Sequence, residues 1–246
     1  MPAGIKIEDL SFSYTPGNRI LKSVSLEINP GEKFGIIGPS GSGKSTLLLH
    51  LNGVLKGETG RVDIGNITVT AKNLPEVRKL VGLVFQNPDD QLFNPTVEED
   101  VAFGPLNFGL PETEVRERVA EALAMMNLSG FEKLTSHHLS AGERKRVALA
   151  TVLSMKPEVL AFDEPFSNLD PSMVMQLMEI MGSLESTQVI VSQSVLPVIA
   201  LCKRMAILKD GEIVAVGETR KLAKDHSLMK ASGLDLSLYR NICHTL

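Results

Sequence analysis

Short runs that are largely apolar recur along the chain and predict the strands of a buried sheet. They span residues 34–37, 81–86, 159–166 and 187–194. Runs that are apolar throughout are typical of strands covered on both faces, as in parallel sheets. The opening of the chain differs, because residues 5–28 alternate in places around a turn, and this predicts an antiparallel layer ahead of the sheet.

The middle of the chain follows a helical pattern instead. Val115, Val119, Ala122 and Met126 recur on one face of the segment 112–127, and Glu and Arg cover the other face. This spacing is that of a helix with one buried stripe. The neighbouring methionines are interpreted as core filling.

Two capping boxes mark further helix starts in this region. Thr96 is followed by Glu99, and Ser140 is followed by Glu143, each at the spacing at which the two side chains satisfy free backbone N–H groups. Together these patterns predict an α/β fold formed by one domain over 1–246. The core, with a mostly parallel sheet, comprises residues 1–87 and 156–220. A helical lobe of about residues 88–155 is inserted in this core, and a C-terminal tail of about residues 221–246 follows it.

The segment GPSGSGKST lies between the strand of residues 34–37 and a predicted helix, which is the setting of a phosphate-binding loop. Its glycines allow a tight turn with N–H groups directed at an anion, and the helix start adds a positive dipole end. Lys44 can reach terminal phosphates, and the Ser45 hydroxyl can hold Mg²⁺. The alternative is a glycine-rich turn without function, which the flanking elements disfavour. The candidate residues are Gly38, Pro39, Ser40, Gly41, Ser42, Gly43, Lys44, Ser45 and Thr46.

Three more polar groups stand at the carboxyl ends of predicted strands, where ligands bind in open α/β folds. Gln86 ends one strand, and Asp163 and Glu164 end another. Beside a phosphate-binding loop, the first carboxylate can complete a Mg²⁺ shell and the second can orient or deprotonate water. Without that loop, a polar strand end and an exposed acidic turn would be sufficient interpretations.

The helix start at Ser140 is a second candidate phosphate site, because small residues, among them Gly142, leave its N–H groups unobstructed. Arg144, Lys145 and Arg146 lie in its first turns, against the usual preference of the helix dipole. The alternative is an ordinary capped helix with a solvated basic face. Tyr14, in the antiparallel layer, can stack on an adenine ring or simply pack on the sheet.

Composition narrows the class of protein. A net charge of −4 over 246 residues argues against a nucleic-acid surface. Two distant cysteines, Cys202 and Cys243, are typical of a reduced, cytosolic chain, and Cys202 is expected in the core. No window approaches the roughly 20 apolar residues of a membrane span. Any work at a membrane is therefore expected to depend on partners.

Together these motifs resemble the nucleotide-binding subunit of ATP-binding-cassette (ABC) transporters. GPSGSGKST is similar to the Walker A loop, Gln86 to the Q-loop, LSAGE to the signature, VLAFDE to Walker B and SNLD to the D-loop, in the family's order from about residue 5 to 217. FQNPDDQLF resembles, more narrowly, the ATPase subunits of energy-coupling-factor importers, which take up cobalt, nickel or vitamins.

The resemblance implies ATP and Mg²⁺ as cofactors and a head-to-tail pair of ATPase subunits, identical or homologous. Ser140 and Gly142 then contact the partner's ATP, Tyr14 stacks on adenine, and Ser45, Gln86 and Asp163 hold Mg²⁺. Lys44 and Glu164 act within the chain's own site. The other implied partners are an integral membrane permease, gripped by the helical lobe and Q-loop, and a substrate-binding membrane subunit, with no nucleic acid. The chain is then peripheral to the cell membrane on its cytoplasmic face.

One residue departs from the family pattern. The family usually has His after the strand that follows Walker B, and this chain has Gln193. Its amide can donate a hydrogen bond but cannot carry a positive charge or shuttle a proton. The hypothesis is that hydrolysis is slowed while ATP binding survives, so Gln193 joins Glu164 as a candidate catalytic residue. Two alternatives to a transport ATPase remain: an ATP-binding regulatory subunit, and a soluble ABC-class ATPase, which the single cassette disfavours. The transported substrate is not encoded in these motifs.

Overall fold

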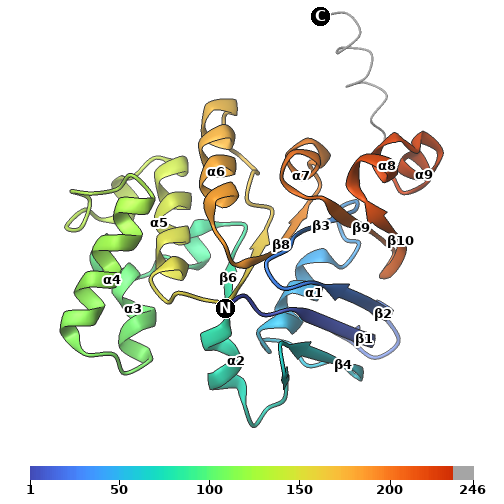
Figure 1. Ribbon diagram of the computed structural model, residues 1–246, viewed down its shortest axis with the longest axis horizontal. Helices are drawn as coiled ribbons and strands as arrows, with labels where there is room; N and C mark the ends of the chain where they lie inside the picture. The colour runs from blue at the N-terminus through green and yellow to red at the C-terminus, as the bar shows by residue number, and fades with distance from the viewer. Residues whose placement is uncertain (235–246) are drawn as a thin grey trace, which may run out of the picture.

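The computed structural model describes residues 1–234, which form two sheets with helices packed around them (Figure 1). The antiparallel sheet has the order β2-β1-β4-β5. Its strands are β1 (Ile5–Ser13), β2 (Arg19–Ile28), β4 (Thr59–Ile64) and β5 (Ile67–Thr68). This is the antiparallel layer that the alternating pattern of the opening segment predicts.

The second sheet has six strands in the order β10-β9-β3-β8-β7-β6, and only β10 is antiparallel to its neighbour. Its strands are β3 (Lys33–Ile37), β6 (Val81–Val84), β7 (Val159–Asp163), β8 (Thr187–Ser192), β9 (Arg204–Lys209) and β10 (Glu212–Glu218). The parallel strands β3, β7 and β8 are neighbours. The segments that follow them therefore meet at one edge of the sheet, and this confirms the predicted α/β fold.

Buried side chains divide between the two faces of this sheet. In β8, Val189 and Val191 pack with the antiparallel layer and the helix α1 (Lys44–Leu51), whereas Ile190 packs on the opposite face with the helices that follow β6 in the chain. Successive side chains of a strand point to opposite faces, so a continuous apolar run serves two cores at once.

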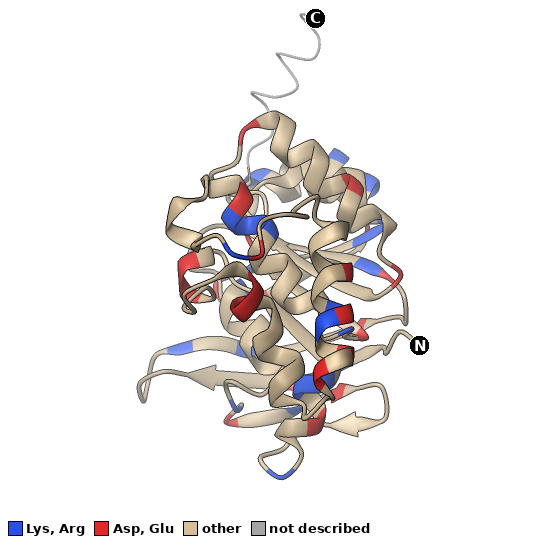
Figure 2. Cartoon of the chain, turned by 90° about the vertical axis from the view of Figure 1, so that its left-hand side faces the viewer, with Lys and Arg blue, Asp and Glu red and all other residues tan. Residues whose placement is uncertain are grey.

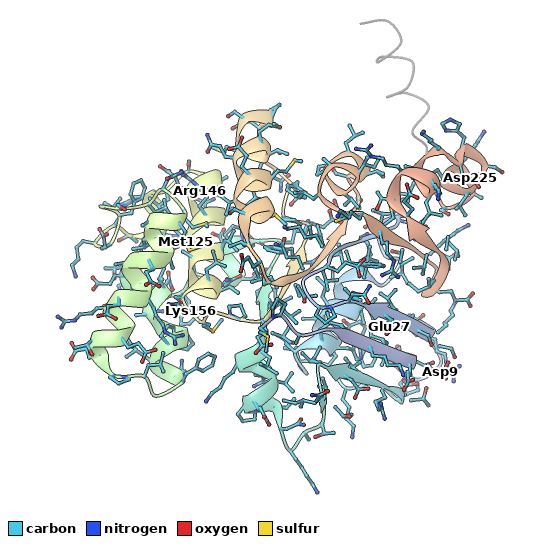
Figure 3. All side chains as sticks on the ribbon, viewed as in Figure 1. Asp9, Glu27, Met125, Arg146, Lys156 and Asp225 are labelled. Carbon is cyan, nitrogen blue, oxygen red and sulfur yellow. The ribbon has the colours of Figure 1, made fainter. Side chains whose placement is uncertain are left out.

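Three helices lie between β6 and β7 in the chain and form one side of the molecule, at the left of Figure 1. They are α3 (Val97–Asn107), α4 (Glu112–Met125) and α5 (Ala141–Leu153). Both predicted capping boxes are present, at the starts of α3 and α5. Figure 2, viewed from this side, shows acidic and basic residues interspersed, and Figure 3 places Arg146 and Lys156 there, apart from Asp9 and Glu27 on the antiparallel layer.

The remaining elements are short or lie toward the end of the chain. They are α2 (Leu74–Leu80), the 3₁₀ turns Pro88–Asp90 and Ser136–His138, α6 (Pro171–Ser183), α7 (Val195–Leu201), α8 (Thr219–Lys224) and α9 (His226–Ala231). Within residues 1–234, no helix is both long and apolar enough to cross a lipid bilayer. The predicted tail of 221–246 begins with α8 and α9, and its residues from 235 onward lie outside the described part of the chain.

Three details differ from the sequence prediction. β6 ends at Val84, before Gln86. The next residue, Phe85, directs its N–H away from the sheet and donates a hydrogen bond of 3.2 Å to Gln91 Oε1. β7 likewise ends at Asp163, so Glu164 stands just beyond its strand. Of the neighbouring methionines, Met126 is fully buried but Met125 is 47% exposed, and the interpretation of both as core filling was wrong for Met125.

Candidate functional site

The loop between β3 and α1 is shaped by glycines whose conformations exclude other residues. Gly41 and Gly43 have φ angles of +76° and +105°, in the region that favours glycine. A Cβ on Gly38 would lie 2.1 Å from the carbonyl oxygen of Leu208, so its close approach to β9 also requires glycine. The result is a tight loop that leads into the first N–H groups of α1, as the motif predicts.

Lys44 is 6% exposed and folds back onto this loop. Its Nζ donates to the carbonyl oxygens of Gly38 at 2.9 Å and Pro39 at 3.1 Å, and it lies 3.6 Å from Glu164 Oε1. Burial lowers the pKa of Lys44, while the charges of Glu164 and Asp163 oppose that shift. Because uncharged carbonyls are its hydrogen-bond acceptors, the ammonium can exchange them for an anionic ligand.

Ser45 is exposed to the cleft beside this loop, and its Oγ donates to Asp163 Oδ1 at 2.9 Å. Burial raises the pKa of Asp163, an effect that this hydrogen bond partly offsets. A hydroxyl and a carboxylate oxygen at this separation are the hard donors that Mg²⁺ prefers. The two residues therefore fit the predicted metal role, with several coordination positions left to water and phosphate.

Glu164 is 6% exposed, and its backbone has a φ angle of +45°, which is uncommon for a residue other than glycine. Its Oε2 accepts hydrogen bonds from the Gln193 N–H at 3.0 Å and the Ser192 hydroxyl at 3.3 Å, both at the end of β8. Its Oε1 is buried and has no hydrogen-bond partner within the described residues. One oxygen thus fixes the carboxylate, and the other remains available to accept a proton or orient water.

Lys44, Ser45 and Glu164 line one cleft of about 280 Å³. Gln86 and Gln193 also line it, although β6 and β8 end before these residues and not, as the sequence predicts, at them. Tyr14 stands at its rim, 58% exposed, with its hydroxyl 3.3 Å from Thr46 Oγ1. The residues that line the cleft are Tyr14, Ile20, Ser40, Gly41, Gly43, Lys44, Ser45, Thr46, Gln86, Glu164 and Gln193.

Ser140 and Gly142 are not among the residues that line this cleft. Ser140 caps α5, with its Oγ accepting from the Glu143 N–H at 3.3 Å and donating to Glu143 Oε2 at 2.6 Å. A Cβ on Gly142 would lie 2.1 Å from Met173 Sδ in α6, so the flexible Met173 side chain would have to move to admit it. The structure therefore brings the Lys44, Asp163 and Glu164 groups together and leaves this second phosphate site apart from them.

The alternative of a solvated basic face does not describe Arg144, Lys145 and Arg146, because all three are partly buried. Arg144 donates to the Leu139 carbonyl at 2.7 Å, and Arg146 donates to the Met126 carbonyl at 3.1 Å. Lys145 donates to carbonyls of the turn that follows β7. Their position near the positive end of the helix dipole is the sequence feature that could have indicated this, because a cation there is unfavourable unless it has hydrogen-bond acceptors of its own.

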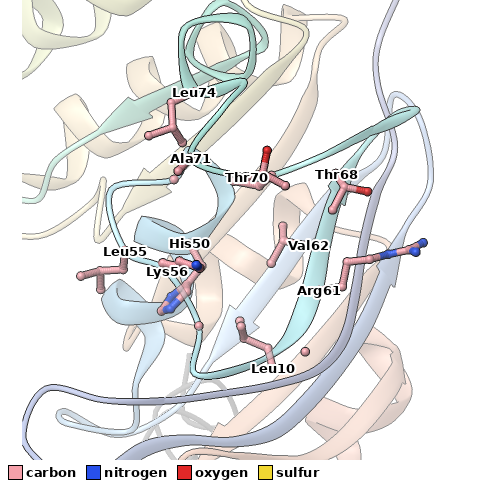
Figure 4. Close-up of a pocket in the computed structure, with 14 residues that line it drawn as sticks. Leu10, His50, Leu55, Lys56, Arg61, Val62, Thr68, Thr70, Ala71 and Leu74 are labelled. Atoms are coloured by element: carbon pink, nitrogen blue, oxygen red, sulfur yellow. The ribbon is translucent and has the colours of Figure 1, made fainter.

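A separate cavity of about 430 Å³ lies behind the C-terminal turn of α1 (Figure 4). Leu10, Leu55, Val62 and Leu74 form its apolar walls, and His50 reaches it from α1. None of the residues that line it also lines the cleft of Lys44 and Glu164. The candidate nucleotide site is therefore the smaller and more polar of the two.

A glycine loop with a buried lysine, and a serine paired with an aspartate from the neighbouring part of the sheet, define a P-loop nucleotide-binding protein. The family described as ABC transporter matches residues 21–167. The chain belongs to this family and is one of its ATP-binding, ATP-hydrolysing subunits, which confirms the predicted fold and enzyme class.

Individual relatives agree over nearly the whole chain. The energy-coupling factor transporter ATP-binding protein EcfA of Methanothermobacter thermautotrophicus is 45% identical over 94% of this chain and 76% of its own length. The structure of CbiO1 from Clostridium perfringens, described as part of the ABC transporter complex CbiONQ, is 34% identical with a TM-score of 0.83, over 98% of each chain. A dimeric ATP-binding cassette with ADP and phosphate is 31% identical with a TM-score of 0.78, over 88% of this chain and 99% of its own.

Proposed function

We propose that this chain is the ATP-hydrolysing subunit of an energy-coupling-factor importer that takes up a metal ion or vitamin. The observation that carries the proposal is the convergence of Lys44, Ser45 and Glu164 on one cleft, with Asp163 hydrogen-bonded to Ser45. The similarity to EcfA and to CbiO1 supports this particular kind of ABC transporter. In this proposal, a separate membrane subunit binds and selects the transported substrate.

In this proposal Lys44 leaves the carbonyls of Gly38 and Pro39 and binds the terminal phosphates of ATP. Ser45, Asp163 and Gln86 hold Mg²⁺, which neutralises charge on the phosphates when it is bound. The unpartnered Oε1 of Glu164 orients the attacking water and accepts its proton. Tyr14 stacks on the adenine, because its exposed ring is held edge-on to Phe12 with the centroids 4.9 Å apart.

A second ATPase subunit completes the site. Ser140 and the N–H groups at the start of α5 bind phosphate well, yet they do not line the chain's own cleft. In a head-to-tail pair they face the ATP held by the partner's loop. The dimeric cassette with ADP and phosphate supports this arrangement, with a second copy of the chain as the simplest partner.

The membrane permease docks, in this proposal, on an exposed apolar surface formed by Phe93, Phe103 and Leu106. These side chains are 65%, 47% and 55% exposed, and the rings of Phe93 and Phe103 meet edge to face at 4.9 Å. The surface follows the Gln86 segment directly in the chain, so a helix seated there is coupled to the nucleotide cleft. The chain is then a peripheral protein on the cytoplasmic face of the membrane, and a substrate-binding membrane subunit completes the importer.

The test is steady-state ATP turnover of the purified chain with Mg²⁺, compared with Glu164→Gln. We expect Glu164→Gln to lower turnover by at least about a hundredfold, because an amide cannot accept the proton. Its affinity for ATP, measured with a fluorescent analogue, stays within about threefold of the original. Lys133→Met, which removes an exposed ion pair with Glu98, is the control and leaves turnover unchanged. Full turnover of Glu164→Gln would contradict the assignment.

A second candidate function is an ATP-binding regulatory subunit with weakened hydrolysis, and Gln193 is the observation that favours it. Its backbone N–H holds Glu164, and its side chain lines the cleft where the family has His. We expect Gln193→His to raise turnover by about tenfold or more, because an imidazole adds a group that can carry a proton. Unchanged turnover in Gln193→His would remove this candidate, and turnover that needs a different ATPase subunit would favour it.

A further inference from the structure

Lys145 connects the helix that starts with Ser140 to the turn that carries Glu164. From the first turns of α5, its Nζ donates to the carbonyl oxygens of Pro165 at 2.9 Å and Ser167 at 2.6 Å, and to Ser167 Oγ at 3.1 Å. The carbonyl oxygen of Glu164 itself lies 3.4 Å away. One half-buried ammonium thus spans the whole turn from residue 164 to 167.

The turn that Lys145 holds is conformationally unfavourable. Glu164 and Asn168 both have φ angles in the left-handed region, +45° and +58°, although neither is glycine. Such conformations persist only where the surroundings determine them. Within the turn, the Ser167 N–H and hydroxyl donate to the Glu164 carbonyl at 3.1 and 2.9 Å. From outside the turn, Lys145 donates to three of its carbonyl oxygens, and the Val191 carbonyl of β8 accepts from the Glu164 N–H.

The contacts of Lys145 are also unlike those of a surface lysine. It forms no ion pair of 4.0 Å or less with a carboxylate in residues 1–234, and carbonyls and one hydroxyl accept all its hydrogen bonds. Burial lowers its pKa to about 8, against the attraction of Glu164. Burying an ammonium group is unfavourable unless hydrogen bonds compensate for the lost water. The role of Lys145 is therefore to hold the groups that accept its hydrogen bonds, and not to keep the helix soluble.

We propose that Lys145 is a positioning residue that keeps the Glu164 carboxylate in its catalytic orientation by fastening its turn to the start of α5. The end of β8 holds the side chain of Glu164 through Oε2 and its N–H through the Val191 carbonyl oxygen at 3.0 Å, and Lys145 holds its carbonyl oxygen from the opposite element, α5. Since Ser140 begins the same helix, the fastening also ties the group that contacts the partner's ATP to the group that activates water. The inference rests on the proposed role of Glu164.

The experiment compares Lys145→Met with the unchanged chain and with Lys133→Met, an exposed ammonium in the same lobe. We expect Lys145→Met to lower kcat by about tenfold or more, because several charge-assisted hydrogen bonds are lost. The affinity for ATP and the KM stay within about twofold, because Lys145 does not line the cleft. A kcat within twofold of the original, or a parallel loss of ATP binding, would overturn the inference.

The decisive comparison combines Lys145→Met with Glu164→Gln. If Lys145 acts only through Glu164, the double variant hydrolyses ATP no more slowly than Glu164→Gln alone, measured as single turnover of labelled ATP. A further loss in the double variant would overturn the inference and assign Lys145 another role. If Glu164→Gln alone left turnover intact, the proposed function would fail first, so the two failures are distinguishable. Lys145→Gln, which keeps two donors, serves where Lys145→Met does not fold, and it shows a smaller loss of kcat.

Discussion

At the scale of residues, the site depends on two buried charged groups, Lys44 and Glu164, that have few hydrogen-bond partners of opposite charge. Lys44 contacts two carbonyls and lies 3.6 Å from Glu164, and Glu164 has one buried oxygen without a hydrogen bond. Buried charges are stabilised by ligands that complete such contacts. The phosphates of ATP would place further negative charge beside the Lys44 ammonium. ATP binding should therefore change the protonation of Lys44, which can be measured.

We predict that ATP binding takes up a proton at alkaline pH. Burial lowers the pKa of Lys44 in the free chain, and bound phosphates raise it again, so Lys44 gains a proton on binding and the affinity for ATP falls as pH rises toward the ordinary value of about 10.4. Calorimetry at about pH 9 in two buffers of different ionisation enthalpy measures the uptake. Lys44→Arg, which stays charged, is expected to show none. Proton release by the unchanged chain would contradict the prediction.

At the scale of elements, close packing of strands against helices positions the site. β6 carries Gly82 beneath α5, where a Cβ would lie 2.2 Å from Val152 Cγ1 and 3.0 Å from Pro157 Cγ. Since β6 leads to Gln86 and α5 begins at the Ser140 cap, this contact sets how the lobe approaches the nucleotide cleft. Methyl groups added there cannot be accommodated without moving the helix.

We therefore predict that Gly82→Ala lowers the free energy of unfolding by about 1–3 kcal/mol through overpacking. Gly182→Ala, in α6, is the matched control, because nothing lies within 4 Å of the added Cβ and φ is not in the left-handed region. It is expected to stabilise the chain by about 0.5 kcal/mol through helix propensity. Urea unfolding of both variants measures the difference, and equal stabilities would contradict the packing argument.

The same scale shows what could be predicted from sequence. The positions of the strands along the chain and both capping boxes follow from local patterns and appear as predicted. The predicted strands extend too far, to Gln86 and Glu164. A hydrogen bond from Phe85 to the Gln91 side chain ends the first strand, and the left-handed backbone conformation of Glu164 ends the second. The acceptors of Lys145 lie about twenty residues along the chain and depend on how α5 packs, which no local pattern encodes.

At the scale of the whole molecule, the two helix starts that are proposed to bind phosphate lie on different parts of the chain. One is the loop before α1, which opens to the cleft, and the other is the start of α5, which does not line it. Phosphoryl transfer needs donors around the whole of the terminal phosphate. The proposed account is therefore that each active site forms between two chains.

Mixing two inactive variants tests this account most directly. Lys44→Ala removes the loop lysine, and Ser140→Arg blocks the start of α5, so neither variant alone hydrolyses ATP at the rate of the unchanged chain. In a head-to-tail pair of one of each, one site loses both residues and the other keeps both. We predict that an equal mixture recovers up to about a quarter of the original turnover, because half of the pairs are mixed and each has one intact site. A mixture no more active than its components, although the unchanged chain turns over alone, would show that the site lies within one chain and would contradict the account.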